Sequence, residues 1–382
     1  MLQTFLRIYP HDLVDGGMEE VLDRLHGEVG ATGVSVWAGS PAVVQWRAQP
    51  IDPRILRTSG GLYFRPDDQH YSATRIKPIV ANDMRGWDSI ELAVKACWDR
   101  GIAIRLVISA SMIGHLPESY PDVATKNVYG DRSHVAICLA NPDVQNLLKG
   151  MLTDLSTRYE LSGVVMTDFA IAWPDAGSSR FRAATEIGAL EAELLSACFC
   201  ESCHQGGEAA GVEVTAARRS VEKILQGKID RDGMSERRME TALSHHTPLA
   251  EYFAWRANEL SSLWAKTTES CPCGLLLDCG HDPSASRQHE RIDWSLPAGV
   301  MAQIDSVDDW TSVMREGVVR SEARIPACLA GGTHGPELVG ALAAAVEHGV
   351  SAVEIDDYAL LSDAALDTIK QAFRFARRES VV

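Results

Sequence analysis

Carboxylates stand at the ends of several short apolar runs in this chain. The clearest run is Gly163–Phe169, which reads Gly-Val-Val-Met-Thr-Asp-Phe and places Asp168 at its end. A short apolar run with β-branched residues, bounded by turn residues, is typical of a buried strand. In parallel α/β folds, ligands and catalytic groups gather at the carboxyl ends of the strands. We therefore expect Asp168 to lie in a site, with capping or salt bridging as its simpler alternative role.

Three further carboxylates belong to later apolar runs of the same kind. Several carboxylates in one pocket suit general acid/base catalysis, because close like charges raise the pKa of one group while another stays ionised. Glycoside hydrolysis needs such a pair. An N-cap for the following helix is the main alternative for two of them, Asp278 and Asp305. The predicted catalytic set is Asp168, Asp278, Asp305 and Glu354.

Aromatic, basic and histidine side chains near the same strand ends, or in the adjoining loops, are candidates for binding a substrate. Indole rings can stack on sugar faces, and charged side chains can reach hydroxyl-rich or anionic ligands. Core or rim packing is the competing role for the tryptophans, and fixing the loop is the competing role for the two loop cations. The predicted substrate-binding set is His11, Trp37, Arg75, Lys77, His115, Trp173, His281, His334 and Asp356.

The run 351–358 carries three acidic residues, and the alternation of side chains along a strand assigns each of them to one face. Glu354 and Asp356 point to one face, and Asp357 points to the other. Glu354 is the deeper residue, so we expect it to be buried beneath the pocket. A buried carboxylate needs a partner, and Arg105 on an earlier predicted strand is a candidate.

The sharpest local motif is a group of three cysteines, Cys198-x-Cys200-x-x-Cys203. Three thiols at this spacing can reach one metal ion, and Zn²⁺ takes four nitrogen or sulfur ligands. We predict a structural Zn²⁺ site, because a closed thiolate site keeps no open position for catalysis. Three reduced thiols at a helix end are the alternative. The spacing leaves the fourth ligand open among His204, Cys138, Cys97, Cys271 and Cys273.

A metal-dependent reaction at the strand ends is a second interpretation of the histidines. His11, His115, His281 and His334 could hold a divalent ion together with nearby aspartates. The sequence contains no His-Glu-x-x-His motif, no Gly-x-Ser-x-Gly elbow and no P-loop. This interpretation would make the protein a metal-dependent isomerase or hydrolase.

The elements that must position these residues follow a repeated strand–helix order. Predicted helices follow most of the strands, and two long segments interrupt the order, a loop over 40–86 and a helical insertion over 183–269. This order favours one (β/α)₈ barrel domain over residues 1–382, since such barrels run from about 200 to over 400 residues. A doubly wound open sheet is the alternative, although no Gly-x-Gly-x-x-Gly follows the first strand. The eight predicted strands cover 4–9, 33–38, 102–109, 163–168, 274–279, 299–305, 324–330 and 351–358.

Composition limits the classes of partner that we expect the chain to bind. The formal net charge of −16 argues against nucleic acid or an anionic membrane as the main partner. No run of about 18 apolar residues and no signal-peptide pattern is present, so we expect a cytoplasmic protein without a membrane span. Nine cysteines in such a chain indicate thiols or a metal site. The expected partner is a small molecule or an oligosaccharide, and the acidic surface is compatible with a monomer or a homodimer.

Three motifs together resemble a known group of proteins. Asn141-Pro142-Asp143-Val144, then Gly163–Phe169, then Cys198-Phe199-Cys200-Glu201-Ser202-Cys203 resemble a family of glycoside-hydrolase-like TIM barrels, distantly similar to α-amylase-type enzymes. The pattern of that family is Asn-Pro before a helix, Gly-x-x-x-Asp-Tyr on the fourth strand and Cys-Phe-Cys-x-x-Cys soon after.

The resemblance implies that Asp168 matches the fourth-strand aspartate, read as nucleophile or stabiliser. Asp168-Phe169-Ala170-Ile171 stands where the family often has Asp-Tyr-x-Arg. The same cysteine spacing occurs in a zinc-containing class of β-galactosidases, in which the metal is structural. We therefore expect a carbohydrate-active enzyme, with hydrolysis of a glycoside as its reaction and Asp168 as nucleophile or base. The acid would be Asp278, Asp305 or Glu354, and a non-catalytic sugar-binding barrel is a further alternative.

Overall fold

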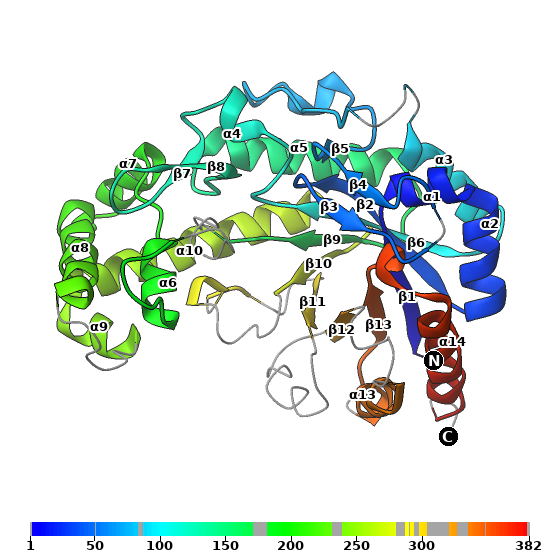
Figure 1. The fold of residues 1–382 in the computed structure, drawn as a ribbon. Coiled ribbons are helices and arrows are strands. Elements are labelled where there is room, and N and C mark those ends of the chain that lie inside the picture. Colours follow the sequence, from blue (N-terminus) through cyan, green and yellow to red (C-terminus); the bar gives the residue numbers. More distant parts are fainter. Residues whose placement is uncertain are drawn as a thin grey trace.

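Eight parallel strands close into a barrel in the computed structural model, which describes residues 2–49, 51–82, 86, 88–170, 182–230, 239–279, 287–289, 291–293, 298–303, 321–326, 335–347 and 349–379. The first strand pairs with both the second and the last, so the ring is complete (Figure 1). The (β/α)₈ barrel prediction is confirmed. The strands, in barrel order, are β1 (Gln3–Ile8), β2 (Gly33–Ser40), β6 (Ala103–Ser109), β9 (Val164–Thr167), β10 (Leu275–Asp278), β11 (Ala298–Gln303), β12 (Ser321–Pro326) and β13 (Ala352–Asp356).

Helices connect the strands on the outside of the barrel, as the right-handed βαβ crossover requires. Helix α5 (Pro142–Arg158) begins behind the N-cap Asn141, whose side chain accepts hydrogen bonds from the amides of Asp143 and Val144. This cap confirms the Asn-Pro helix start expected from the sequence. The other connecting helices are α1 (Pro10–Gly16), α2 (Met18–Asp23) with the π-helical η1 (Arg24–Val29), α3 (Ser89–Trp98), α13 (Gly335–Glu347) and α14 (Asp363–Glu379).

Three segments extend the loops at the carboxyl end of the barrel. The loop over 40–86 holds β3 (Val44–Trp46), β4 (Ile55–Arg57), β5 (Gly61–Leu62) and the short 3-10 helix η2 (Asp68–Tyr71). The segment between β6 and α5 holds α4 (Leu116–Ser119) and an antiparallel hairpin of β7 (Ala124–Lys126) and β8 (Arg132–Ile137). The sequence pattern did not indicate this hairpin.

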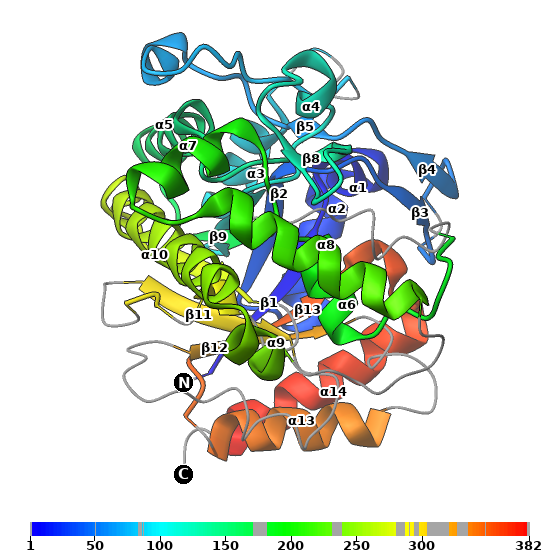
Figure 2. The same ribbon diagram turned by 90° about the vertical axis from the view of Figure 1, so that its left-hand side faces the viewer.

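The third extension lies between β9 and β10 and is helical. It contains α6 (Ala189–Leu195), α7 (Glu201–Ala209), α8 (Val214–Asp230), α9 (Met239–His245) and the long α10 (Thr247–Glu269). Figure 2 shows α6, α8 and α9 in front of the barrel strands, on the side where β9 leads into this segment. No helix among the described residues has the length and apolar character that crossing a membrane requires.

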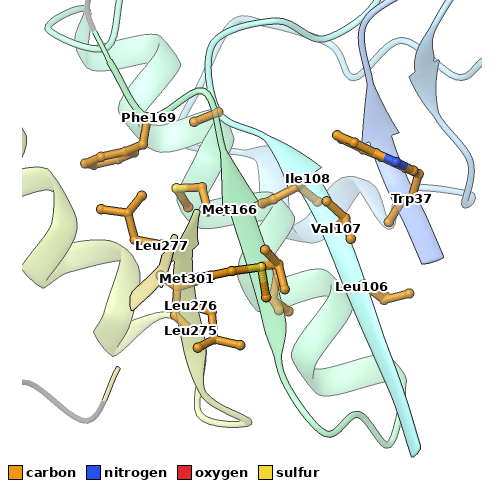
Figure 3. Close-up of a cluster of buried hydrophobic side chains, with 14 of the residues drawn as sticks. Trp37, Leu106, Val107, Ile108, Met166, Phe169, Leu275, Leu276, Leu277 and Met301 are labelled. Carbon is orange, nitrogen blue, oxygen red and sulfur yellow. The ribbon is translucent and has the colours of Figure 1, made fainter. Parts of the chain in front are cut away.

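Aliphatic side chains pack the barrel strands together and against the helices. Leu106 and Ile108 of β6, Met166 of β9 and Leu277 of β10 are fully buried (Figure 3). Branched and long apolar side chains at alternate strand positions are what a close-packed interface between a sheet and its helices demands. The inward positions of several strands are charged, and these side chains form the candidate site.

Candidate functional site

Asp168 lies directly after β9, in a turn that presents its carboxylate at the barrel mouth. Its φ angle is +53°, in the left-handed region that aspartate tolerates better than most residues. The hydroxyls of Ser109 (2.6 Å) and Thr167 (2.9 Å) both donate to the same carboxylate oxygen, Oδ2. Ser111 donates to the backbone carbonyl of Asp168 at 2.8 Å and fixes the turn. The other carboxylate oxygen, Oδ1, takes no hydrogen bond from the described residues.

Phe169 anchors this turn from the opposite side. Its ring is buried and packs edge-on against Trp264 of α10, with ring centroids 5.7 Å apart. Its backbone carbonyl bonds the Nε2 atom of His289 at 2.5 Å. The turn after β9 therefore directs Phe169 into the helical layer and leaves Asp168 at the mouth.

The electrostatic surroundings of Asp168 favour a carboxyl that can carry a proton. Burial raises the pKa of Asp168, and the charge of Asp278 raises it further. The hydrogen bonds from Ser109 and Thr167 and the charge of Arg324 lower this pKa, yet the net direction is upward. A carboxyl with a raised pKa beside ionised groups is the arrangement that acid/base catalysis uses.

Two more carboxylates meet at the mouth around a single arginine. Arg324 of β12 places Nε 2.8 Å from Asp278 and Nη1 3.0 Å from Asp356. Arg7 of β1 reaches the same Asp278 at 3.1 Å. Asp278 is nearly buried, whereas Asp356 and Arg324 are half-buried. Asp278 therefore lies within ion-pair distance of two arginines.

Glu354 lies beneath this cluster in the barrel interior. It pairs with Arg105 at 2.8 Å and with Arg7, and it accepts a hydrogen bond from Ser35. Burial opposes its ionisation, but the two arginines and the serine outweigh burial and lower the pKa of Glu354. Its side chain is 0% exposed. The partner expected from the sequence, Arg105, is thus confirmed, and Glu354 supports the site from below.

Asp357 comes directly after β13 and is the N-cap of the 3-10 helix η7 (Tyr358–Leu360), so strand alternation does not govern its side chain. Its carboxylate accepts a hydrogen bond from Gln45 at 2.8 Å, and Gln45 also bonds Nε2 of His11 at 3.0 Å. Burial lowers the pKa of His11 to about 4, so the imidazole is neutral at pH 7. His11 is therefore part of a buried hydrogen-bond chain behind the mouth.

Aromatic rings form one wall next to the charged cluster. Tyr9 stacks on His11 and on Trp37, with ring centroids 4.9 and 5.3 Å apart. The guanidinium of Arg7 lies 5.6 Å from the Trp37 ring centroid. Trp37 is almost buried, and its Nε1 atom has no hydrogen-bond partner among the described residues. Figure 3 shows Trp37 apart from the aliphatic side chains of β9 and β10, on the other side of β6.

The remaining predicted site residues fall in other places. Arg75 is half-exposed and binds Asp143 at 2.8 Å and also Asp122, so it ties the 40–86 segment to the start of α5. Lys77 is exposed, and its backbone amide donates to the Tyr120 hydroxyl. His115 is half-buried just before α4. Trp173, His281, Asp305 and His334 lie outside the described residues.

The cysteine motif folds into a buried four-thiol cluster. The sulfur atoms of Cys138, Cys198, Cys200 and Cys203 all lie within 4.8 Å of one another, and all four residues are buried. Cys138 comes directly after β8, and Cys200 is the residue before α7. The structure thus brings Cys138, one of five alternatives left open by spacing, to the other three. A cluster of this kind could hold a metal ion.

Neighbouring groups orient the thiols. The amide of Lys126 donates to the sulfur of Cys198 at 3.4 Å, and the amide of Phe199 donates to the carbonyl of Lys126 at 2.7 Å. The Tyr252 hydroxyl of α10 binds the carbonyl of Cys198, and its ring stacks on Phe199. The β7–β8 hairpin, the cysteine turn and α10 are therefore joined at one point. Within the described residues, this cluster is the only group of three or more potential ligand side chains arranged to hold a metal.

Similarity to known proteins is structural. No family model matches the sequence, and no curated protein matches it. The catalytic domain of β-amylase from Paenibacillus polymyxa aligns with 98% of this chain and 98% of its own, with a TM-score of 0.60 and 8% identity. The PgaB (BpsB) glycoside hydrolase domain from Bordetella bronchiseptica aligns over 100% of both chains, with a TM-score of 0.59 and 11% identity.

The chain has the TIM-barrel fold of glycosidases. An α-L-fucosidase, isoenzyme 2 from Paenibacillus thiaminolyticus, also aligns with 100% of this chain, with a TM-score of 0.57 and 10% identity. The present chain spans 50% of the length of that fucosidase. At such identities the likeness shows the fold alone, and the chemistry must be argued from the side chains.

Sequence reasoning missed the cations of the site. Arg7 and Arg324 lie within barrel strands, and a cation on the inward side of a barrel strand requires a carboxylate partner, which is the signal that could have found them. Ser109 was noted only as the end of a strand, although its hydroxyl holds the carboxylate of Asp168. Together with the acidic residues predicted from the sequence, these three residues make up the candidate site.

Proposed function

We propose that this protein is a glycoside hydrolase whose reaction takes place at the barrel mouth. The observation that carries the proposal is the arrangement of Asp168, Asp278 and Asp356 at the ends of three strands around Arg324. A glycosidase needs one carboxyl that gives a proton to the leaving oxygen and one carboxylate that stabilises or attacks the sugar carbon. A mouth with both kinds of group meets that requirement.

The structure favours a different division of roles from the one expected from the sequence. Asp168, with its raised pKa and an Oδ1 atom not engaged by the described residues, suits the proton donor. Asp278 is paired with Arg7 and Arg324 and suits the ionised partner that faces the developing positive charge on the sugar ring. Asp356 shares Arg324 and would position that cation. Glu354, fully buried, acts through Arg7 in this proposal.

Trp37 and Tyr9 would supply the contact with the sugar. Their stacked rings, with centroids 5.3 Å apart, border the charged cluster. An apolar ring face next to charged hydrogen-bonding groups is the combination that carbohydrate sites use. The substrate proposed on these grounds is a small glycoside or an oligosaccharide.

The four-thiol cluster would hold a structural Zn²⁺ ion. Four buried thiolates match the tetrahedral sulfur set of structural zinc sites, in which Zn–S bonds of about 2.3 Å leave no open position. The Cys138 and Cys203 sulfurs are 3.5 Å apart, close to the edge of such a tetrahedron. The ion would fix the hairpin against the helical segment, and the reaction would not use it.

Turnover by the wild type and by Asp168→Asn on a panel of aryl glycosides and oligosaccharides tests the proposal. Wild-type release of sugar and a loss of about 10³-fold in the variant are expected for a proton donor. Because burial raises the pKa of Asp168 above its unfolded value, its ionised form costs folding free energy at neutral pH. The variant should therefore melt at or above the wild-type temperature, which separates lost catalysis from lost folding. Equal turnover in both proteins would remove Asp168 from the mechanism.

A further inference from the structure

A second pair of cysteines lies at the end of the barrel opposite the mouth. Cys271 and Cys273 flank Pro272 in the turn that joins the end of α10 to the start of β10. Their sulfur atoms are 3.6 Å apart. The four-thiol cluster is complete without them, and the proposed reaction does not use them.

Backbone contacts hold this turn in one shape. The amide of Cys271 donates to Thr268 of α10 at 3.1 Å, and the amide of Gly274 donates to the carbonyl of Cys271 at 3.0 Å. The carbonyl of Gly274 accepts the amide of Val164 at 2.9 Å, and Gly274 has a φ of +100°, which favours glycine. Both ends of the turn are therefore anchored, and the two thiols are kept on the same side.

We propose that Cys271 and Cys273 form a reversible dithiol–disulfide centre, which a low-molecular-weight disulfide oxidises. Disulfide sulfurs are about 2.05 Å apart, so the observed contact must shorten by roughly 1.5 Å, which side-chain rotation can supply. The Cα atoms of residues two apart in a turn lie within the limit of about 7 Å for a disulfide. The pair is thus placed to react without movement of α10 or β10.

The two thiols differ in the way that a two-step exchange requires. Cys273 is half-buried and open to a small molecule, whereas Cys271 is 2% exposed. Hydrogen bonding from Cys271 lowers the pKa of Cys273, while that bond and burial raise the pKa of Cys271. Cys273 is therefore the attacking thiolate, and Cys271 is the resolving thiol.

The exchange balances with oxidised glutathione as the oxidant. The Cys273 thiolate attacks one glutathione sulfur, forms a mixed disulfide and releases one glutathione thiolate. Cys271 then gives up its proton and attacks Sγ of Cys273, which expels the second glutathione and leaves the protein disulfide. Two protein thiols are oxidised and one glutathione disulfide is reduced to two thiols. A disulfide across so short a loop gains little loop-closure entropy, so reduced glutathione should reverse it readily.

Thiol trapping on the full chain, followed by tandem mass spectrometry, tests the proposal. After oxidised glutathione, the wild-type segment 271–273 should lose two hydrogens and resist alkylation, and excess reduced glutathione should restore both thiols. Cys271→Ser should retain one glutathionyl group on Cys273. Cys273→Ser should leave Cys271 unmodified because that thiol is buried. Cys279→Ser, a thiol of the same tryptic segment at the other end of β10, should behave as the wild type.

The measurement on the wild-type protein tests the dithiol–disulfide proposal even if a variant fails to fold. Full alkylation of both thiols after exposure to oxidised glutathione would overturn the proposal. A stable glutathionyl adduct on wild-type Cys273, with Cys271 still free, would overturn it as well, because the resolving step would then be absent.

Discussion

At the scale of single residues, the hydroxyl of Ser109 tests what Asp168 does. Ser109 donates to the carboxylate of Asp168, so Ser109→Ala removes a bond that favours the ionised form and raises the pKa of Asp168 further. If Asp168 is the proton donor, activity falls as pH rises through this pKa. The alkaline limb of the pH–kcat/KM profile should therefore move to higher pH in the variant.

Ser111 offers a matched control for that measurement. Its hydroxyl donates to the backbone carbonyl of Asp168 and not to the carboxylate. Ser111→Ala should leave the alkaline limb in place. A shift of the acidic limb in Ser109→Ala, with the alkaline limb fixed, would assign Asp168 to the role of base or nucleophile, as the sequence resemblance implied.

At the scale of elements, the four-thiol cluster joins segments that are distant in the sequence. Zinc content should be about one ion per chain, and Cys138→Ser should lower zinc affinity and the melting temperature because only three thiolates remain. Cys97→Ala, which removes a buried thiol outside the cluster, should retain the metal. Metal analysis of the purified protein measures the zinc content. A competition assay with a chromogenic chelator measures the zinc affinity. Equal zinc content in Cys138→Ser and wild type would exclude Cys138 as a ligand.

The sequence revealed those features of these elements that depend on local rules. The cap at Asn141 and the need of Glu354 for a cation both follow from residue type and spacing. The fourth thiol did not follow, because the contact between Cys138 and Cys203 exists only after the hairpin packs on the helical segment. Short elements were also missed, since the three residues of β7 are too few for a periodic pattern.

At the scale of the whole molecule, buried ion pairs replace part of an apolar barrel interior. Arg105 is fully buried between Glu322 and Glu354. Arg105→Leu leaves both carboxylates without this partner and should cost about 3–5 kcal/mol of unfolding free energy, measured by urea denaturation. The double variant with Glu322→Leu should recover part of that loss, because one of the two carboxylates that lost Arg105 is then removed.

Arg75 provides the comparison for that denaturation series. It also contacts two carboxylates, but it lies at the surface. Arg75→Ala should unfold at nearly the wild-type urea concentration, since exposed ion pairs contribute little. If Arg105→Leu also unfolded at the wild-type urea concentration, the interior ion pairs would not stabilise the barrel.

The closure of the barrel by β1 and β13 has a consequence for synthesis and folding. The register pairs Gln3 with Ala352, so the two strands that seal the ring are far apart in the sequence, and β13 is made after the other seven barrel strands. Until β13 arrives, a nascent chain would expose the free edges of β1 and β12, which another strand can pair with. Loop-closure entropy grows only slowly with chain length, so the long separation costs little once both strands exist. A chain that stopped before β13 would leave the edges of β1 and β12 without this partner strand, and we expect such a chain to aggregate.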